Sequence, residues 1–345
     1  MKRTPAFAVI VVAALMAACV PKVAPLGEMP STPKISDAGF LTDDGLTLPY
    51  RRWLPKGGVA NVKAVVLALH GFNDYSKAFD KVPDAPGVGP TLAAEGIAVY
   101  AYDQRGFGRA PNPGIWAGDE VLIGDFKTFA RALKQTYPDV PLYGLGESMG
   151  GAVVLTALAS QSPPPVAGVV LAAPAVWARP TMPLTYRIAL WFGAHFLPSF
   201  KPTGESLGRM ASDNIAMLRD NGRDPLFIKK TRIDAVYGLT NLMDEALTAT
   251  GQIKRVPILY LYGKNDQIIP KNATTRAMKT LEKNDPDAKA AFYSEGWHMI
   301  LRDKNAPVVL ADIAAFVRDP KTPLPSGADH QALTRLAQGN SPRRD

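Results

Sequence analysis

Short apolar segments alternate with longer stretches of helix-forming residues along most of the chain. From Ala64 onward the apolar segments have the length of buried strands, and the segments between them have the length of helices. A hairpin over residues 39–54, turning at Asp43-Asp44-Gly45, precedes them. This order predicts the α/β class, with a mostly parallel sheet wrapped by helices. The predicted strands are residues 65–69, 140–145, 167–172, 257–262 and 289–294, and the predicted helices are residues 88–95, 118–136, 148–161, 271–283 and 306–317.

The segment Gly146-Glu147-Ser148-Met149-Gly150 lies between a predicted strand and a predicted helix. A serine on such a turn, with glycine two residues before it and two after it, is typical of a nucleophile elbow. The turn is so tight that a side chain at Gly146 or Gly150 would collide with the neighbouring strand or helix. Ser148 is therefore a candidate nucleophile, and the alternative is an ordinary glycine-rich turn of another α/β protein.

A serine hydroxyl is a weak nucleophile, so this interpretation requires a base and an orienting acid elsewhere in the chain. Of the four histidines, His330 lies in a polar tail, His195 lies in an aromatic stretch and His70 closes a predicted strand. His298 follows the strand 289–294, on a loop where catalytic groups of open α/β sheets lie. His298 is the candidate base, and the alternative is a structural histidine.

Asp266 lies on the loop that leaves the predicted strand 257–262. It produces the chain order serine, aspartate, histidine that accompanies a nucleophile elbow. The preceding strand is followed by Ala173-Pro174-Ala175-Val176-Trp177, which offers no carboxylate. Asp266 is therefore the candidate acid, and the alternative is an ordinary turn or helix-capping aspartate.

A tetrahedral intermediate also requires two convergent N–H donors for its oxyanion. One donor is expected from Met149, the residue after the nucleophile, and the other from Phe72, on the loop after strand 65–69. His70 then has a structural role in holding that loop.

Five segments of the chain together resemble the α/β-hydrolase superfamily, and within it the serine hydrolases that are monoacylglycerol lipase-like or lysophospholipase-like. The segments are Leu69-His70-Gly71-Phe72, Tyr102-Asp103-Gln104-Arg105-Gly106-Phe107-Gly108, Gly146-Glu147-Ser148-Met149-Gly150-Gly151, Tyr262-Gly263-Lys264-Asn265-Asp266 and Gly296-Trp297-His298. The resemblance covers roughly residues 37–317. It implies an α/β-hydrolase fold with a mostly parallel, eight-stranded sheet flanked by helices and a helical cap inserted between core strands.

The resemblance also implies roles for single residues. It implies that Asp103 and Arg105 are scaffold residues of a neighbouring loop. Residues 72–75, Phe-Asn-Asp-Tyr, depart from the glycine and acidic-His pattern of many monoacylglycerol lipases, so the acyl and alcohol preference stays open. The implied catalytic triad is Ser148, Asp266 and His298, and the implied oxyanion donors are Phe72 and Met149.

The stretch 177–253 falls between two predicted strands and is too long for a simple connection. Its residues 183–197 are apolar almost all round, and helix-like stretches follow at 214–219 and 231–250. We expect a helical cap that supplies an apolar acyl pocket over the active site. Contact of this cap with lipid stays open, because apolar helices are more often buried against a core.

The N-terminus resembles a bacterial lipoprotein signal. Met1-Lys2-Arg3 is followed by an apolar run that ends at Leu15-Met16-Ala17-Ala18-Cys19, and small residues before a cysteine are typical of a lipobox. Cys19 is the only cysteine, so it has no partner for a disulfide within the chain. We expect lipidation of Cys19 and, because Val20 rather than aspartate follows it, attachment to the bacterial outer membrane, facing the periplasm. The alternatives are an ordinary secretion signal or a membrane anchor with an incidental cysteine.

Length, charge and composition exclude several other classes of protein. The chain is long enough, at 345 residues, for one large core with a cap. Its net charge is +8, but no basic run with interleaved aromatic residues predicts nucleic-acid binding. No nucleotide-binding glycine fingerprint and no Cys/His cluster occurs, so we expect neither cofactor nor metal.

The sequence therefore predicts a serine carboxylic ester hydrolase that acts on a small acyl ester or lipid, with a membrane contact through Cys19. A peptidase or amidase of the same fold and a non-catalytic envelope binding lipoprotein are the alternatives. The oligomeric state stays open. The expected organisation is a signal peptide (1–18), a tether (19–36), a hydrolase core in two parts (37–176 and 254–319), a cap (177–253) and a disordered tail (320–345).

Overall fold

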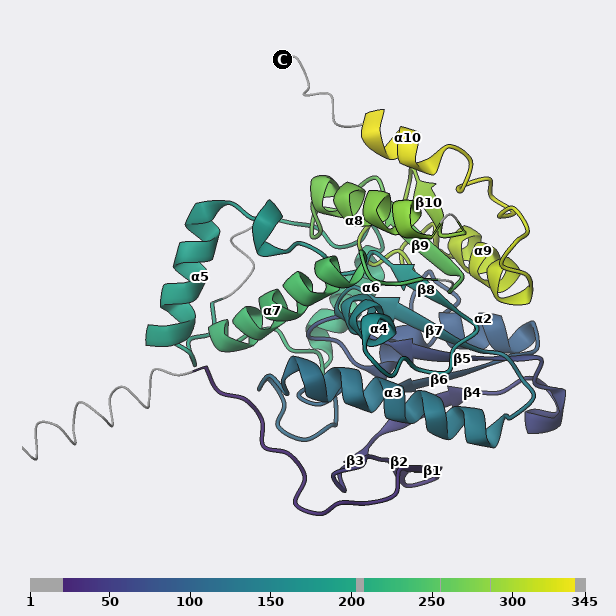
Figure 1. Ribbon diagram of the computed structural model, residues 1–345, viewed down its shortest axis with the longest axis horizontal. Helices are drawn as coiled ribbons and strands as arrows, with labels where there is room; N and C mark the ends of the chain where they lie inside the picture. Colours follow the sequence, from purple (N-terminus) through teal and green to yellow (C-terminus); the bar gives the residue numbers. More distant parts are fainter. Residues whose placement is uncertain (1–20, 203–207, 255, 286, 339–345) are drawn as a thin grey trace, which may run out of the picture.

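The computed structural model describes residues 21–338 except 203–207, 255 and 286. Its main sheet has seven strands in the order β10-β9-β8-β7-β5-β6-β4, and every neighbouring pair is parallel except β4 with β6 (Figure 1). This confirms the α/β class and the mostly parallel sheet. The strands are β4 (Tyr50–Trp53), β5 (Ala64–Leu69), β6 (Ile97–Tyr102), β7 (Leu142–Glu147), β8 (Gly168–Ala172), β9 (Ile258–Gly263) and β10 (Lys289–Tyr293).

Helices cover both faces of this sheet, so its central strands are apolar without alternation. In β5, Val65 and Leu67 pack in one core with residues of α3 and α4, whereas Val66 and Ala68 pack in a second core with residues of α2 and α9. The helices of the core are α2 (Val88–Ala94), α3 (Asp119–Thr136), α4 (Met149–Ala159), α8 (Lys271–Asn284) and α9 (Ala306–Arg318), and short 3-10 helices lie at Gly58–Asn61, Ser76–Phe79 and Arg179–Thr181.

The expectation of an eight-stranded sheet is wrong for the described residues. The predicted hairpin 39–54 divides at Pro49, which has no N–H with which to continue a ladder. Its first part forms β2 (Gly39–Leu41) and β3 (Thr47–Leu48), which make a separate three-stranded sheet with the preceding β1 (Lys34–Ser36). Its last part is β4, which pairs antiparallel with β6.

The expectation of a tether is also wrong from Lys22 onward, because this segment lies against the domain. The Lys22 N–H donates to the Asp234 carboxylate at 3.1 Å, and the Ala24 N–H donates to the Trp116 carbonyl at 2.7 Å. These bonds from backbone N–H groups hold the proline-containing segment on the domain. The expected signal peptide and Cys19 lie outside the described residues.

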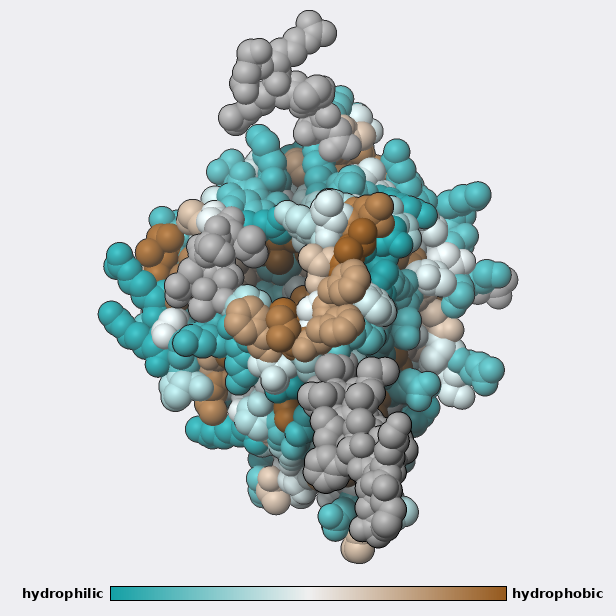
Figure 2. All heavy atoms as spheres, turned by 90° about the vertical axis from the view of Figure 1, so that its left-hand side faces the viewer, coloured by the Kyte–Doolittle hydropathy of each residue, from teal (hydrophilic) through white to brown (hydrophobic). Residues whose placement is uncertain are grey.

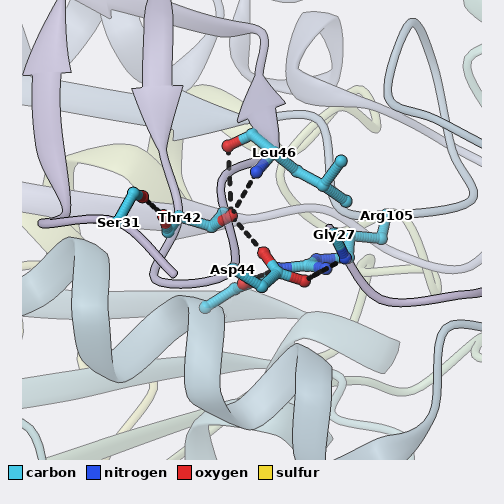
Figure 3. Close-up of polar contacts among 7 residues, drawn as sticks. Gly27, Ser31, Thr42, Asp44, Leu46 and Arg105 are labelled. Atoms are coloured by element: carbon cyan, nitrogen blue, oxygen red, sulfur yellow. Dashed lines mark hydrogen bonds and ion pairs between the residues drawn. The ribbon is translucent and has the colours of Figure 1, made fainter. Parts of the chain in front are cut away.

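A polar network then holds the next part of the N-terminal segment (Figure 3). The Gly27 N–H donates to Asp44 at 2.7 Å, and the Ser31 hydroxyl donates to the Thr42 carbonyl. Arg105 donates to both oxygens of Asp44 and, on its other side, to both oxygens of Asp125. Arg105 therefore joins the β2–β3 turn, the loop after β6 and α3, which agrees with a scaffold role.

The tail after residue 320, expected to be disordered, is packed on the core as far as Gln338. Leu324, Ala328 and Leu336 are buried, and the last helix, α10 (Ala332–Gln338), lies beside β10. The Phe292 N–H donates to the Ala328 carbonyl at 2.9 Å. The segment thus covers the edge strand of the sheet, and its spaced apolar residues outweigh its polar composition.

Between β8 and β9 the chain forms α5 (Leu184–Phe196), α6 (Ile215–Arg223) and α7 (Ile233–Ala249). Helix α7 packs against α4 and α5, and α5 lies at the outer side of this insertion (Figure 1). Across the part of the chain that the structure describes, no helix combines the length and the apolar character needed to cross a bilayer.

Candidate active site

Ser148 lies on the turn between β7 and α4, with φ of 51° and ψ of −113°. A Cβ at Gly146 would lie 2.5 Å from the backbone of Gly150, and a Cβ at Gly150 would lie 2.2 Å from the carbonyl oxygen of Leu69. Both glycines are therefore required by space, as expected for a nucleophile elbow. The strained backbone of Ser148 presents its hydroxyl above the end of the sheet.

The structure brings the three predicted side chains into one hydrogen-bonded row. His298 Nε2 lies 3.0 Å from Ser148 Oγ, and His298 Nδ1 lies 2.9 Å from Asp266 Oδ2. The other carboxylate oxygen of Asp266 accepts the N–H groups of Ile268 and Ile269 at 2.8 and 2.9 Å. Asp266 is therefore fixed by backbone donors, and it orients the imidazole toward the serine.

The loops that carry Asp266 and His298 meet through two glycines. A Cβ at Gly263 would lie 2.3 Å from the backbone of Gly296, so the end of β9 and the loop after β10 approach without side chains between them. The Asn265 N–H donates to the Gly296 carbonyl at 2.9 Å. Close backbone approach thus brings together two residues that are 32 positions apart.

The surroundings of His298 favour its protonated form. Burial by itself lowers the pKa of this imidazole, but the Asp266 carboxylate and then Glu147 outweigh burial and hold the pKa above its ordinary value. A negative partner behind the ring stabilises the imidazolium that forms when the ring accepts a proton from Ser148.

The two expected N–H donors come from different loops, Met149 from the turn that carries Ser148 and Phe72 from the loop after β5. Met149 is the first residue of α4, where backbone N–H groups have no intrahelical acceptor. A Cβ at Gly71 would lie 3.3 Å from Ser148 Cβ, so the loop that continues into Phe72 passes beside the serine. The Phe72 ring packs edge-on against Phe107.

The remaining histidines do not join the row. His70 is buried; its Nδ1 contacts the Gly71 carbonyl at 2.8 Å, and its Nε2 accepts the Gln104 N–H at 3.0 Å. It joins the loop after β5 to the loop after β6, which agrees with the structural role predicted for it. Asp103 accepts the N–H groups of Ser76 and Arg109 and is likewise engaged in holding loops.

A buried ion network behind the serine was not predicted from the sequence. One Arg302 nitrogen, Nη2, donates to Asp74 at 2.7 Å and to Glu147 at 3.1 Å, and all three side chains are buried. Asp74 follows β5, Glu147 precedes the nucleophile, and Arg302 follows His298. Glu147 is visible within the elbow motif, but no spacing rule connects it to an arginine 155 positions later.

Among the described residues, no group of three or more His, Cys, Asp or Glu side chains is arranged to hold a metal ion.

The fold and the geometry around Ser148 define the class of the α/β-hydrolases in which a serine, a histidine and an aspartate form one hydrogen-bonded row. The chain belongs to the Hydrolase_4 family, described as "Serine aminopeptidase, S33", whose model matches residues 60–305. The matched range includes all three residues of the hydrogen-bonded row.

The relatives are lipases and esterases by name. The chain is 25% identical over 277 residues to the monoglyceride lipase of Mus musculus, covering 75% of this chain and 82% of that protein. It is 25% identical over 293 residues to the monoacylglycerol lipase of Mycolicibacterium smegmatis, covering 82% of this chain and 96% of that protein. The chain is a hydrolase of the serine esterase type.

Solved structures share the fold. The crystal structure of Paleococcus ferrophilus monoacylglycerol lipase matches with a TM-score of 0.63 at 20% identity, covering 80% of this chain and all of that chain. A soluble variant of monoglyceride lipase from Saccharomyces cerevisiae, in complex with a substrate analog, matches with a TM-score of 0.66 at 18% identity, covering 87% of this chain and 98% of that chain.

Proposed function

We propose that the protein hydrolyses carboxylic esters with an apolar acyl part through an acyl-enzyme formed on Ser148. His298 removes the hydroxyl proton as Ser148 Oγ attacks the ester carbonyl, and Asp266 holds the imidazole tautomer. The N–H groups of Phe72 and Met149 stabilise the oxyanion. The proton passes from His298 to the leaving alcohol. Water, deprotonated by His298, then releases the acid and restores Ser148. The observation that carries this proposal is the hydrogen-bonded row from Ser148 to Asp266.

Monoacylglycerols and lysophospholipids are the proposed substrates. The names of the relatives support this choice. An apolar cavity beside the Phe72 loop, lined by residues that include Phe72, Phe107 and Trp116, has a volume of about 10 Å³, which is room for about one water molecule and not for an acyl chain. A larger hollow of about 570 Å³ between α8, β10 and α10 contains none of the three residues of the row, so size alone does not identify the substrate site.

An aminopeptidase is the second candidate, because the family description names that activity. Such an enzyme needs a carboxylate available to bind the α-ammonium group of a peptide. At this site Glu147 and Asp74 are both bound by Arg302. Their engagement favours an ester substrate.

A matched substrate panel separates the two activities. We expect turnover of p-nitrophenyl esters from acetate to palmitate, and no comparable turnover of amino-acid p-nitroanilides. Release of p-nitrophenol and p-nitroaniline is measured at equal substrate concentration. Faster cleavage of the anilides than of the esters would contradict the esterase and support the peptidase.

The pH dependence of ester hydrolysis tests the role of His298. Because a base must be neutral and the pKa of His298 is raised above 6.5, we expect kcat/KM to fall on the acid side with a midpoint above pH 6.5. Glu147→Gln removes one negative charge that raises this pKa, so the acid limb is expected to move to lower pH. Glu95→Gln, in an exposed pair with Arg318, is the matched control and leaves the limb in place. An acid limb that Glu147→Gln does not move would contradict this assignment.

We also propose that the protein is anchored to the outer membrane through lipidated Cys19 and faces the periplasm. The lipobox-like segment before Cys19 supports this proposal. Mass spectrometry of the mature N-terminal peptide tests it, and an unmodified terminus other than Cys19 would exclude lipidation.

A further inference from the structure

Helix α5 leaves most of its apolar surface exposed. Ala194 is its one buried side chain, and Gly193 and His195 contact α7. Ile188, Trp191, Phe192 and Phe196 are 46 to 60% exposed. Their spacing places them along one side of the helix. Leu184, Tyr186, Leu197 and Phe200 are exposed as well. We call these eight residues together the α5 apolar face.

This face is unusual for a soluble domain, in which exposed apolar residues are scattered singly. Its eight residues lie within one segment of 17 positions, and they make up about half of the large exposed apolar side chains of the described chain. Figure 2 shows apolar side chains gathered on the side of the molecule to which α5 belongs. A tryptophan and a tyrosine among them suit the boundary between headgroups and acyl chains.

The segment that carries the α5 apolar face is mostly basic in sequence, although Arg179 within it is paired with Asp244. Between Trp177 and Ser212 the sequence contains one acidic residue, Glu205. The basic residues of the same segment are Arg179, Arg187, Lys201 and Arg209. Arg187 and Lys201 are exposed, one within α5 and the other next to Phe200. Basic groups beside an apolar helix favour a surface of anionic lipid headgroups.

The docked N-terminal segment brings the proposed anchor to this same side. Lys22 is bound to Asp234 in the first turn of α7, and the neighbouring N–H groups of Ile233 and Asp234 donate to Phe200 and Pro198. In Figure 1 the described chain accordingly begins beside the start of α7. Cys19 lies three positions before Lys22, so a fully extended chain spans at most about 11 Å between them.

We propose that the α5 apolar face is a bilayer-contact surface, held against the membrane by the docked segment from Lys22 and the acyl chains on Cys19. The proposal rests on the proposed lipidation of Cys19, and it goes beyond the proposed esterase activity. A free tether would let the domain move away from the bilayer, whereas the docked segment limits both its distance and its orientation. Ester lipids in the same leaflet then lie beside the cap.

Fluorescence of Trp191 tests the contact directly. The lipidated full-length protein is reconstituted in vesicles of phosphatidylethanolamine and phosphatidylglycerol whose acyl chains are brominated. We expect strong quenching of a tryptophan component that Trp191→Phe removes, although four other tryptophans remain. Absence of quenching of that component would overturn the proposal, and so would an N-terminal peptide in which Cys19 carries no lipid.

A pair of variants tests its consequence. Phe192→Ser with Phe196→Ser is expected to lower hydrolysis of vesicle-embedded monoacylglycerol by on the order of tenfold or more, since burial of each phenylalanine is worth at least about a factor of ten. Turnover of p-nitrophenyl acetate in solution stays unchanged. Val308→Ser, on α9 and 43% exposed, is the matched control and alters neither rate.

The outcomes separate the possible explanations. Wild-type protein that quenches at Trp191 but hydrolyses no ester would support the membrane contact and contradict the esterase. Equal loss of both rates in the Phe192 and Phe196 variant would overturn the membrane proposal in favour of a general structural effect. A concentration-dependent dimer that the variant abolishes, without quenching at Trp191, would show that a second copy covers the face.

Discussion

Replacing Ser148 with alanine is expected to lower kcat for p-nitrophenyl esters by on the order of 10⁴-fold or more, while the protein stays folded. The hydroxyl is the atom that His298 Nε2 contacts at 3.0 Å, so its removal leaves no nucleophile for acyl transfer. Alanine has a Cβ like serine and meets the same backbone strain at φ of 51°, so the turn itself is retained. Initial rates and circular dichroism of both proteins measure the two effects.

Ser160→Ala provides the matched control. Ser160 lies at the opposite end of α4 and donates to the Ala157 carbonyl, so this variant loses one local hydrogen bond and keeps its turnover. A fluorophosphonate probe is expected to label the wild type and Ser160→Ala but not Ser148→Ala, because an activated serine is required for labelling. Equal inactivity and no labelling in folded wild-type protein would favour a non-catalytic envelope lipoprotein.

Replacing Arg302 with methionine is expected to lower the free energy of unfolding by about 3–5 kcal/mol. Arg302 lies at the centre of the buried network, and its removal leaves the Asp74 and Glu147 carboxylates facing each other without a cation. Leaving one charge of a buried pair unpaired costs more than forming the pair contributes. Urea unfolding followed by tryptophan fluorescence measures the change.

An exposed arginine pair supplies the control for this experiment. Arg318 contacts Glu95 at 3.2 Å, but their side chains are 59% and 49% exposed, so Arg318→Met is expected to cost less than about 1 kcal/mol. Adding Glu147→Gln to Arg302→Met removes one uncompensated charge and is expected to recover part of the lost stability. Equal effects of Arg302→Met and Arg318→Met would show that the buried network contributes no more than a surface pair.

The buried network also connects the loops that the chemistry needs. Asp74 follows the strand β5 that leads to the Phe72 loop, Glu147 adjoins Ser148, and Arg302 lies four residues after His298. An arginine that binds two of these loops from the third limits their relative movement. The geometry of the hydrogen-bonded row thus depends on side chains that need not contact substrate.

The sequence was sufficient to predict the strand–helix turn at Ser148 and the three side chains that meet there. Local rules determine such features, because a tight turn admits only glycine at Gly146 and Gly150, and parallel strands place their following loops at one edge of the sheet. The buried strands were predictable for the same reason, since continuous apolar runs of five or six residues in an α/β chain are typical of strands covered on both faces.

The structure of the two terminal segments was predicted less well. The N-terminal segment from Lys22 and the tail after residue 320 have the proline and polar content of free segments, yet both pack on the core. Composition averages over a segment, whereas docking depends on a few positions, such as the Lys22 N–H that meets Asp234 or the side chain of Leu336 that is buried beside β10.

The sequence by itself determined the class of fold, the candidate nucleophile and the order of its partners, because these follow from spacing over a few residues. The tertiary structure alone decided that Arg302 binds Asp74 and Glu147, that α5 keeps its apolar face exposed, and that the segment at Lys22 docks on α7. Each of these depends on contacts between residues far apart in the chain. Such contacts are selected by the packing of whole elements, and no local pattern of apolar and polar positions specifies them.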